Sequence, residues 1–298
     1  MPFSPFIGSL SEPSQPGPPP DQWDKPIPLS FEIGYTLVSD YVFRGINFSE
    51  YPGEGQEMPN HQMDVGVELD TADLGLNAGR VGVSFWFEWF AGQDQLTGDG
   101  GSLQEVDYTV YWSFDLDPIA TTVELGYIAY DFPQASGDAA CTHELYLLLS
   151  LDDSKLFGTE KPVLNPYFYY GIDVDDGDLG SWMELGVSHD FAFGEMAGLE
   201  QTPVLKDLTF TPSFVMGIDH RYLHHFALLG DPAAEGPGTQ IATLTYGGEL
   251  AYDLGGALGM PERYGSVTLS GFLYYNQALR DELISDEFWG GFQVAYAW

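Results

Sequence analysis

The last eleven residues of the chain, 288–298, alternate between large apolar side chains and mostly small or polar ones. The large side chains are those of Phe288, Phe292, Val294, Tyr296 and Trp298. Because successive side chains of a β-strand point to opposite faces, a period of two predicts a strand with one apolar face. A strand with an apolar face, a polar face and aromatic rings near its ends is typical of β-barrels that span a membrane.

The same alternation recurs along most of the chain. Met63, Val65, Val67 and Leu69, for example, alternate with Gln, Asp, Gly and Glu residues. A helix would mix the apolar and polar sets, whereas a strand separates them. The alternating segments, about twelve in number, lie near 31–44, 62–70, 81–90, 105–114, 122–127, 144–151, 164–173, 181–191, 207–218, 241–252, 264–277 and 287–298.

A tilted strand of roughly ten residues is long enough to cross a bilayer, and an even number of strands returns both ends to one side. We therefore predict an all-β fold: one antiparallel, up-and-down transmembrane β-barrel of about 12 strands, formed by residues 29–298, in contact with the lipid of a bacterial outer membrane. Residues 1–28 are rich in Pro, Ser and Gly and are expected to be a disordered lead-in.

Two kinds of membrane-targeting segment are not visible in the sequence. No run approaches the roughly 18 apolar residues of a spanning helix. The first basic residue is Lys25, and nothing before it resembles a charged segment followed by a long apolar stretch. If the chain is exported, we expect its signal peptide to have been removed from this sequence, or its start to be misassigned.

The chain is strongly acidic, with 45 Asp and Glu residues against nine Lys and Arg and a formal net charge of −36. This excess argues against nucleic acid as a partner, because phosphate binding needs cationic side chains. It favours cations, cationic solutes or a heavily hydrated surface. Adaptation to a salty habitat would produce the same composition, so the charge alone does not choose between these alternatives.

A short motif near the N-terminus suggests a family. The segment Ser39-Asp-Tyr-Val-Phe-Arg-Gly-Ile46 resembles the signature of the TorF-like family of putative bacterial outer-membrane β-barrel proteins, in which it lies on the first strand after the leader. The likeness covers about eight residues. The likeness ends after Ile46, because this chain has Asn47-Phe48-Ser49 where the family usually has Ser or Thr followed by Gln. The resemblance implies an outer-membrane barrel and supplies no catalytic residues.

The polar faces of the predicted strands carry acidic residues repeatedly, and Arg44 is the clearest basic residue among them. In a barrel these side chains would point into the lumen and make it electronegative, which attracts cations. They could equally hydrate and rigidify a polar interior, with Arg44 joining the first strand to several carboxylates. Five inward aromatic residues could narrow or plug the lumen: Trp86, Tyr111, Tyr146, Tyr167 and Tyr169. The predicted lumen acids are Glu32, Asp40, Asp64, Glu68, Glu88, Glu105, Asp107, Glu124, Glu144, Glu184 and Glu249.

Two further groups of residues suggest other chemistry. Asp173, Asp175 and Asp178 surround a Gly turn as in part of a calcium loop, although the spacing to Glu184 does not match an EF-hand. A solvated acidic turn is the alternative to calcium, and no other cofactor is expected. Cys141 is the single cysteine, which excludes an intramolecular disulfide; His143 lies two residues away.

The predicted function is that of a porin-like passive channel for small solutes, cationic or neutral, with an acidic lumen that favours cations. The alternative is a closed barrel that is structural or binds a partner. A soluble acidic β-protein is a third possibility. We do not expect an enzyme: in Ser188-His189-Asp190 adjacent side chains of a strand would point to opposite faces and could not form a nucleophile and base pair.

Overall fold

The computed structural model describes seven stretches of the chain. They are residues 29–49, 59–90, 103–135, 141–175, 180–223, 238–280 and 284–298.

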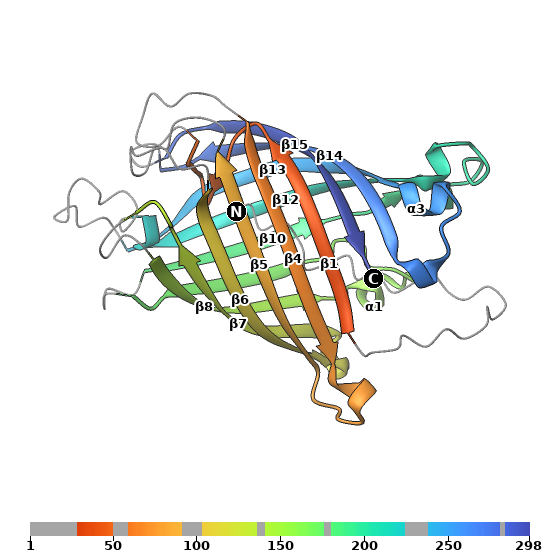
Figure 1. Cartoon of the computed structure of the whole chain (residues 1–298), viewed down its shortest axis with the longest axis horizontal. Coiled ribbons are helices and arrows are strands. Elements are labelled where there is room, and N and C mark those ends of the chain that lie inside the picture. Colours follow the sequence, from red (N-terminus) through yellow and green to blue (C-terminus); the bar gives the residue numbers. More distant parts are fainter. Residues whose placement is uncertain are drawn as a thin grey trace.

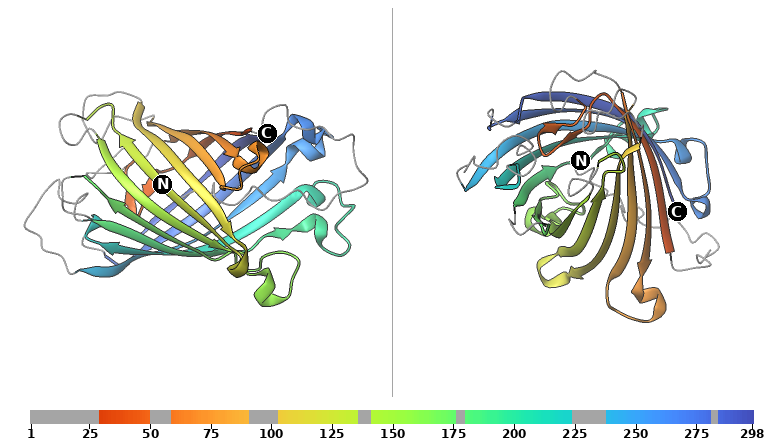
Figure 2. Two further views of the ribbon diagram at one scale, coloured as in Figure 1. Left: turned by 90° about the horizontal axis from the view of Figure 1, so that it is seen from below. Right: turned by 60° about the vertical axis from the view of Figure 1, so that its left-hand side comes forward.

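Long antiparallel strands form one closed barrel (Figures 1 and 2). The described sheet has 13 strands, and setting aside the two-residue β11 (Phe191–Ala192) leaves the predicted twelve. Each pairs with its neighbours along the chain, which confirms the up-and-down topology. The twelve are β1 (Leu29–Val38), β4 (Asn60–Asp70), β5 (Arg80–Phe90), β6 (Leu103–Leu116), β7 (Thr121–Asp131), β8 (Cys141–Leu151), β9 (Tyr167–Asp173), β10 (Ser181–Ser188), β12 (Leu208–His220), β13 (Thr239–Asp253), β14 (Ser266–Ala278) and β15 (Glu287–Ala297).

The barrel closes where its last strand meets its first. β15 pairs with β1 in antiparallel register, with Val38 opposite Gly291. The backbone N–H of Phe31 donates to the carbonyl of Trp298 at 2.8 Å, and the N–H of Trp298 donates back to Phe31 at 2.8 Å. Closure therefore removes the unpaired sheet edges that an open sheet would expose.

The two ends of the barrel differ. Among the described residues, the end where β1 begins carries seven short helices and is called the helix end below; the opposite end, where β1 finishes at Val38, is called the hairpin end. Among the described residues, no helix has both the length and the apolar run required to cross a membrane. The short helices are η1 (Thr71–Leu74), η2 (Asp117–Ile119), α1 (Ser154–Phe157), η4 (Phe193–Glu195), η5 (Leu205–Asp207), α3 (Leu254–Ala257) and η6 (Glu262–Tyr264).

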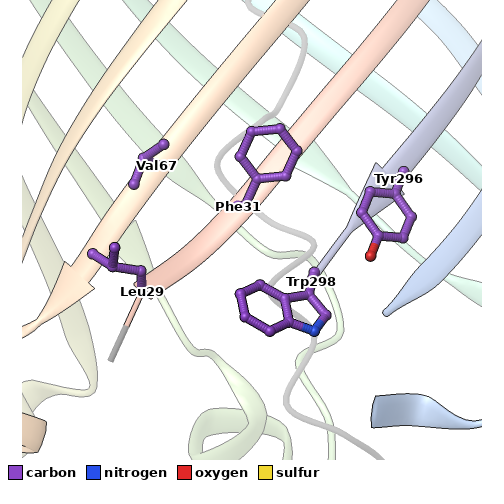
Figure 3. A pocket seen from close by; sticks show the side chains of 5 residues that line it. All are labelled: Leu29, Phe31, Val67, Tyr296 and Trp298. Atoms are coloured by element: carbon purple, nitrogen blue, oxygen red, sulfur yellow. The ribbon is translucent and has the colours of Figure 1, made fainter. Parts of the chain in front are cut away.

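The outer wall is apolar along the strands, as the alternation predicts. Large side chains such as Phe85, Val110, Leu125 and Leu273 are exposed there, although they lie in the middle of strands. In water such a surface would be unfavourable, whereas lipid solvates it. At the helix end, beside the closure of β1 and β15, the outer wall has a hollow of about 320 Å³. Its lining side chains, drawn in Figure 3, are those of Leu29, Phe31, Val67, Tyr296 and Trp298.

The first strand is shorter than the sequence pattern suggests. β1 ends at Val38, although the alternating segment near 31–44 predicts a longer strand, and Tyr41 and Phe43 within that segment are buried. The expectation that Asp40 and Arg44 lie on this strand is also wrong. The chain after Val38 leaves the wall and forms a small separate hairpin of β2 (Val42–Phe43) and β3 (Ile46–Asn47).

A charge on the outer wall tests the lipid-facing assignment. Val110 is 52% exposed near the middle of β6, so we expect Val110→Arg to reduce the free energy of unfolding by about 2–4 kcal/mol in lipid vesicles. Leu258→Arg is the matched control, because Leu258 is 77% exposed in the turn after α3, outside the strands. Denaturant unfolding followed by tryptophan fluorescence measures both; equal effects would contradict the assignment.

Candidate functional site: a hairpin inside an acidic barrel

The turn of the inner hairpin is made by Arg44 and Gly45. Both have positive φ, 52° and 86°, as a two-residue hairpin turn of the primed type requires. Gly45 is needed for a second reason: a Cβ there would lie 2.7 Å from Thr243 Cγ2 and 2.8 Å from Ile284 Cδ1. The motif that resembles the TorF-like signature therefore encodes a tight turn packed inside the barrel.

Arg44 joins this turn to the far wall. Its Nη1 and Nη2 atoms donate to the two carboxylate oxygens of Glu144, on β8, at 2.8 and 2.9 Å. The two side chains are 0% and 2% exposed. The Tyr169 hydroxyl, on β9, also donates to Glu144. A two-pronged pairing of this kind fixes the orientation of both groups as well as their distance.

Aromatic rings surround the guanidinium of Arg44. Its Cζ lies 4.2 Å from the ring centre of Tyr222, 4.7 Å from that of Phe43 and 5.8 Å from that of Trp182. Burial lowers the pKa of Arg44, but the charge of Glu144 raises it, and the resulting pKa lies well above the ordinary value. The group is therefore a permanent cation, stabilised by one carboxylate and by ring faces.

The rest of the hairpin packs against the inner wall. Tyr41 lies 5.3 Å from the ring of Phe48 and 5.3 Å from that of Trp86, and Phe43 lies 6.2 Å from Tyr130. These contacts belong to one buried apolar cluster that fills the barrel at this level. Its members are Tyr41, Phe43, Ile46, Phe48, Trp86, Ile128, Tyr130, Tyr146, Leu148, Tyr169, Trp182, Tyr222, Leu223, Ala242 and Ile284.

A second buried ion pair holds the segment that follows β12. Arg280 Nη1 donates to Asp219 Oδ2 at 2.8 Å, with both side chains almost fully buried. The other oxygen of Asp219 accepts the backbone N–H of Leu223 at 3.0 Å. This arrangement places Tyr222 over Arg44. The sequence pattern does not predict this pair, and its only signal is that Arg280 is one of just nine Lys and Arg residues.

Nearer the helix end, the inner wall repeats one arrangement. A tyrosine ring covers the glycine directly opposite on the next strand, so closely that a Cβ at that glycine would collide with the ring. The pairs are Gly82 with Tyr111, Gly126 with Tyr146, Gly186 with Tyr167 and Gly247 with Tyr274.

Three of these tyrosines hold carboxylates of the inner wall. Tyr111 donates to Glu68 at 3.0 Å, Tyr146 donates to Glu124 at 2.7 Å, and Tyr167 donates to Glu184 at 3.2 Å. We call these three acids and their tyrosines the tyrosine–glutamate belt. The belt fixes the positions of negative charges without neutralising them, because a phenol is an uncharged donor.

The structure places the predicted lumen acids in three groups. Asp40 lies on the segment after β1, where one of its oxygens is 3.5 Å from the Asn47 amide that donates to it. Five acids are buried by the hairpin and the aromatic cluster: Glu88, Glu105, Asp107, Glu144 and Glu184. Five are half-buried on strands: Glu32, Asp64, Glu68, Glu124 and Glu249.

The acidic turn expected to bind calcium is only partly described. Asp178 lies outside the described residues. Asp173 accepts a hydrogen bond from the hydroxyl of Thr142 at 2.9 Å and one from the backbone N–H of Asp175 at 2.8 Å. Both of its carboxylate oxygens are therefore already hydrogen-bonded within the protein. Asp175 itself lies beside Cys141 and His143. Calcium binding by these three residues stays a prediction.

Ser188, His189 and Asp190 have separate partners. The imidazole Nδ1 of His189 donates to the carbonyl of Val163 at 2.6 Å. Asp190 accepts the hydroxyl of Thr211 at 2.7 Å. These contacts do not connect the three side chains into a nucleophile, base and acid.

Comparison with known proteins concerns the architecture. No family model matches the chain, and no curated protein matches it. Among solved structures, it is similar to an outer-membrane channel from Pseudomonas putida F1, with 8% identity, a TM-score of 0.48 and coverage of 94% of this chain and 99% of that one. The NanC porin has 14% identity, a TM-score of 0.43 and coverage of 90% and 98%. The channel DcaP of Acinetobacter baumannii has 7% identity, a TM-score of 0.38 and coverage of 91% and 96%.

The pair of Arg44 and Glu144 is expected to show strong coupling. Removing one partner leaves a buried charge unpaired, so Arg44→Met alone and Glu144→Leu alone should each lower the free energy of unfolding by about 3–5 kcal/mol. The double variant leaves no unpaired charge and should lose much less than the sum. Denaturant unfolding in detergent micelles measures the three values.

The exposed pair of Lys161 and Glu195 is the control, because both side chains are more than half exposed. Lys161→Met should change the free energy of unfolding by about 0–1 kcal/mol. Additive effects at Arg44 and Glu144 would contradict the proposed coupling.

Proposed function

We propose that this protein is a porin-like outer-membrane barrel that conducts small cationic or neutral solutes, with the β2–β3 hairpin as its constriction. The apolar outer wall supports a location in lipid, since a bacterial outer membrane accommodates closed barrels of this kind.

The charge balance inside the barrel carries the proposal. Arg44 is paired with Glu144 and Arg280 with Asp219, so the two buried cations are already matched by carboxylates. Arg80, at the helix end, lies 3.8 Å from Glu68 and 3.1 Å from Asp115. Among the described residues, the remaining acidic side chains of the inner wall outnumber the basic side chains near them. An uncompensated negative wall concentrates cations and repels anions.

The hairpin sets the width of the path. On the helix-end side, the belt acids Glu68 and Glu124 are only partly covered, whereas Glu184 is buried, and Arg44 and Glu144 lie in the packed aromatic cluster. A solute entering from the helix end would meet the belt first and the hairpin afterwards. We therefore expect a low conductance that rises when the hairpin is released from the far wall.

The second candidate function is a closed barrel with a structural or partner-binding role. The aromatic cluster inside the barrel favours it, because fifteen buried apolar residues pack at the level of the hairpin. The two candidates differ in conductance: a channel passes ions at some rate, and a closed barrel passes none.

Single-channel recording in planar bilayers tests the hairpin. We expect the wild-type protein to give small openings and Arg44→Ala to give larger ones, because the substitution removes the contacts with Glu144. Arg263→Ala is the matched control, since Arg263 lies on η6 and stacks on its neighbour Tyr264. Absence of conductance in all three folded proteins would reject the channel and support the closed barrel.

The reversal potential in a salt gradient tests the acidic wall. We expect cation selectivity in the wild type, and a reversal potential closer to zero for the double variant Glu68→Gln and Glu124→Gln, because the two half-buried charges of the belt are lost. Glu160→Gln, on an exposed turn after α1, should leave selectivity unchanged. Anion selectivity, or equal effects of the belt and control variants, would disprove the role given to these acids.

A further inference from the structure

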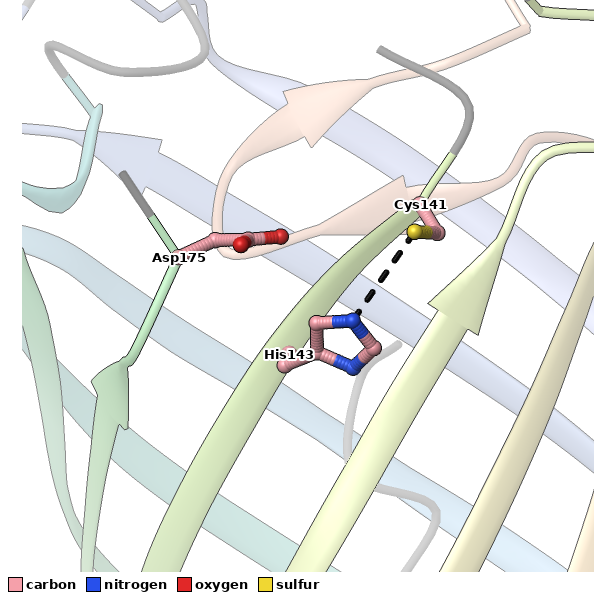
Figure 4. Close-up of side chains that lie close together, drawn as sticks. All are labelled: Cys141, His143 and Asp175. Carbon is pink, nitrogen blue, oxygen red and sulfur yellow. Dashed lines mark hydrogen bonds between the residues drawn. The ribbon is translucent and has the colours of Figure 1, made fainter. Parts of the chain in front are cut away.

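Three potential metal ligands meet on the rim of the hairpin end, away from the acidic inner wall. Cys141 is the first residue of β8, and His143 lies two positions along the same strand, so both side chains share its outer face. Asp175 follows the adjacent strand, β9. Figure 4 shows the three side chains gathered together, with the thiol of Cys141 turned toward the imidazole.

The distances between the ligand atoms suit one small cation. Cys141 Sγ lies 3.8 Å from His143 Nε2, and one ligand atom from each of the three residues lies within 4.8 Å of the others. Tetrahedral zinc, with bonds of about 2.3 Å to sulfur and about 2.0–2.1 Å to nitrogen, separates these two atoms by about 3.6 Å. The observed spacing needs only a small side-chain adjustment to reach that value.

The imidazole of His143 is held from its other side. Its Nδ1 lies 2.6 Å from the hydroxyl of Tyr127, and the two rings stack with centres 5.7 Å apart and planes inclined by 13°. When the Nδ1–H donates to the phenol oxygen, Nε2 keeps its lone pair and faces the thiol. Metal-binding histidines are commonly oriented through the second ring nitrogen in this way.

The backbone brings Asp175 to the same place. The N–H of Val174 donates to the carbonyl of His143 at 2.9 Å, which continues the pairing of β8 and β9 past the end of β9. The N–H of Asp175 donates to Asp173 Oδ1 at 2.8 Å. The Asp175 carboxylate is therefore positioned by a turn and a strand register that do not depend on a metal.

We infer that Cys141, His143 and Asp175 bind a zinc-class divalent cation on the outer rim of the barrel. A thiolate and an imidazole select zinc and similar borderline-soft ions over calcium and magnesium, which take oxygen ligands. Three protein ligands leave the fourth tetrahedral position to water or an exchangeable anion. This site is separate from the solute path proposed above, and it uses Asp175 differently from the calcium loop expected from the sequence.

The single cysteine makes the site directly measurable. Cys141 is exposed, so its reaction with a maleimide reports on one thiol per chain. The purified, folded, untagged protein is reacted with the maleimide across a zinc titration. At zinc near ten times its Kd, about one eleventh of the sites are free, and the reaction should slow about tenfold. Calcium at the same concentration should not protect the thiol.

Substitutions of the other two ligands decide the assignment. His143→Gln and Asp175→Asn should each require a higher zinc concentration for the same protection, while the rate without zinc stays similar. His61→Gln is the matched control: His61 Nδ1 lies 2.5 Å from the Tyr35 hydroxyl, the same outer-wall arrangement, but His61 belongs to no metal-ligand group among the described residues.

Three results would overturn the inference: no zinc protection in the wild type, protection unchanged in both ligand variants, or an equal loss in His61→Gln. Heat-modifiable migration in a gel confirms that each variant is folded, so loss of protection cannot be ascribed to an unfolded barrel. Substitution by cobalt gives an independent readout, because a thiolate-to-cobalt absorption band should appear in the wild type and be absent in Cys141→Ser.

Discussion

The bidentate ion pair between Arg44 and Glu144 is the interaction on which the interior of this barrel depends. It joins residues 100 positions apart, and both charges are removed from water. Desolvation makes such a pair costly, so hydrogen bonds and ring contacts from the surrounding groups are needed to offset that cost. The Tyr169 hydroxyl donates to Glu144 and the rings of Phe43 and Tyr222 lie against the guanidinium of Arg44, whereas Arg44 Nε has no hydrogen-bond partner among the described residues.

Aromatic residues have different roles on the outer wall and in the interior of the barrel. On the outside, rings such as Phe85 face lipid and require no polar partner. Inside, Tyr111, Tyr146 and Tyr167 cover glycines of the neighbouring strand while their hydroxyls hold carboxylates. A ring that lies flat over a glycine leaves room in a narrow lumen, and its hydroxyl keeps the acid in a defined position. The proposed cation preference depends on this fixed geometry as much as on the number of charges.

The sequence predicted the strands well because lipid and lumen impose opposite requirements on alternate side chains. It failed at Tyr41, Phe43 and Arg44, where the alternation continues beyond Val38 although the chain has left the wall. A ring suits the lipid face and the buried cluster equally, so periodicity could not separate them. Local patterns do not specify loop paths or strand register. The sequence therefore could not predict that Arg280 pairs with Asp219, or that Asp175 approaches Cys141.

The position of the hairpin also has a consequence for assembly. Arg44 follows the first strand closely in the chain, yet its carboxylate partner lies on β8 and the rings around it on β9, β10 and the segment after β12. Those strands lie across the ring from β1, so a flat or partly curved sheet holds the two sets of residues apart. The hairpin can make its contacts with the far strands only after most of the wall has curved around it. Docking of the hairpin is therefore a late folding event, and its contacts indicate that the barrel has closed.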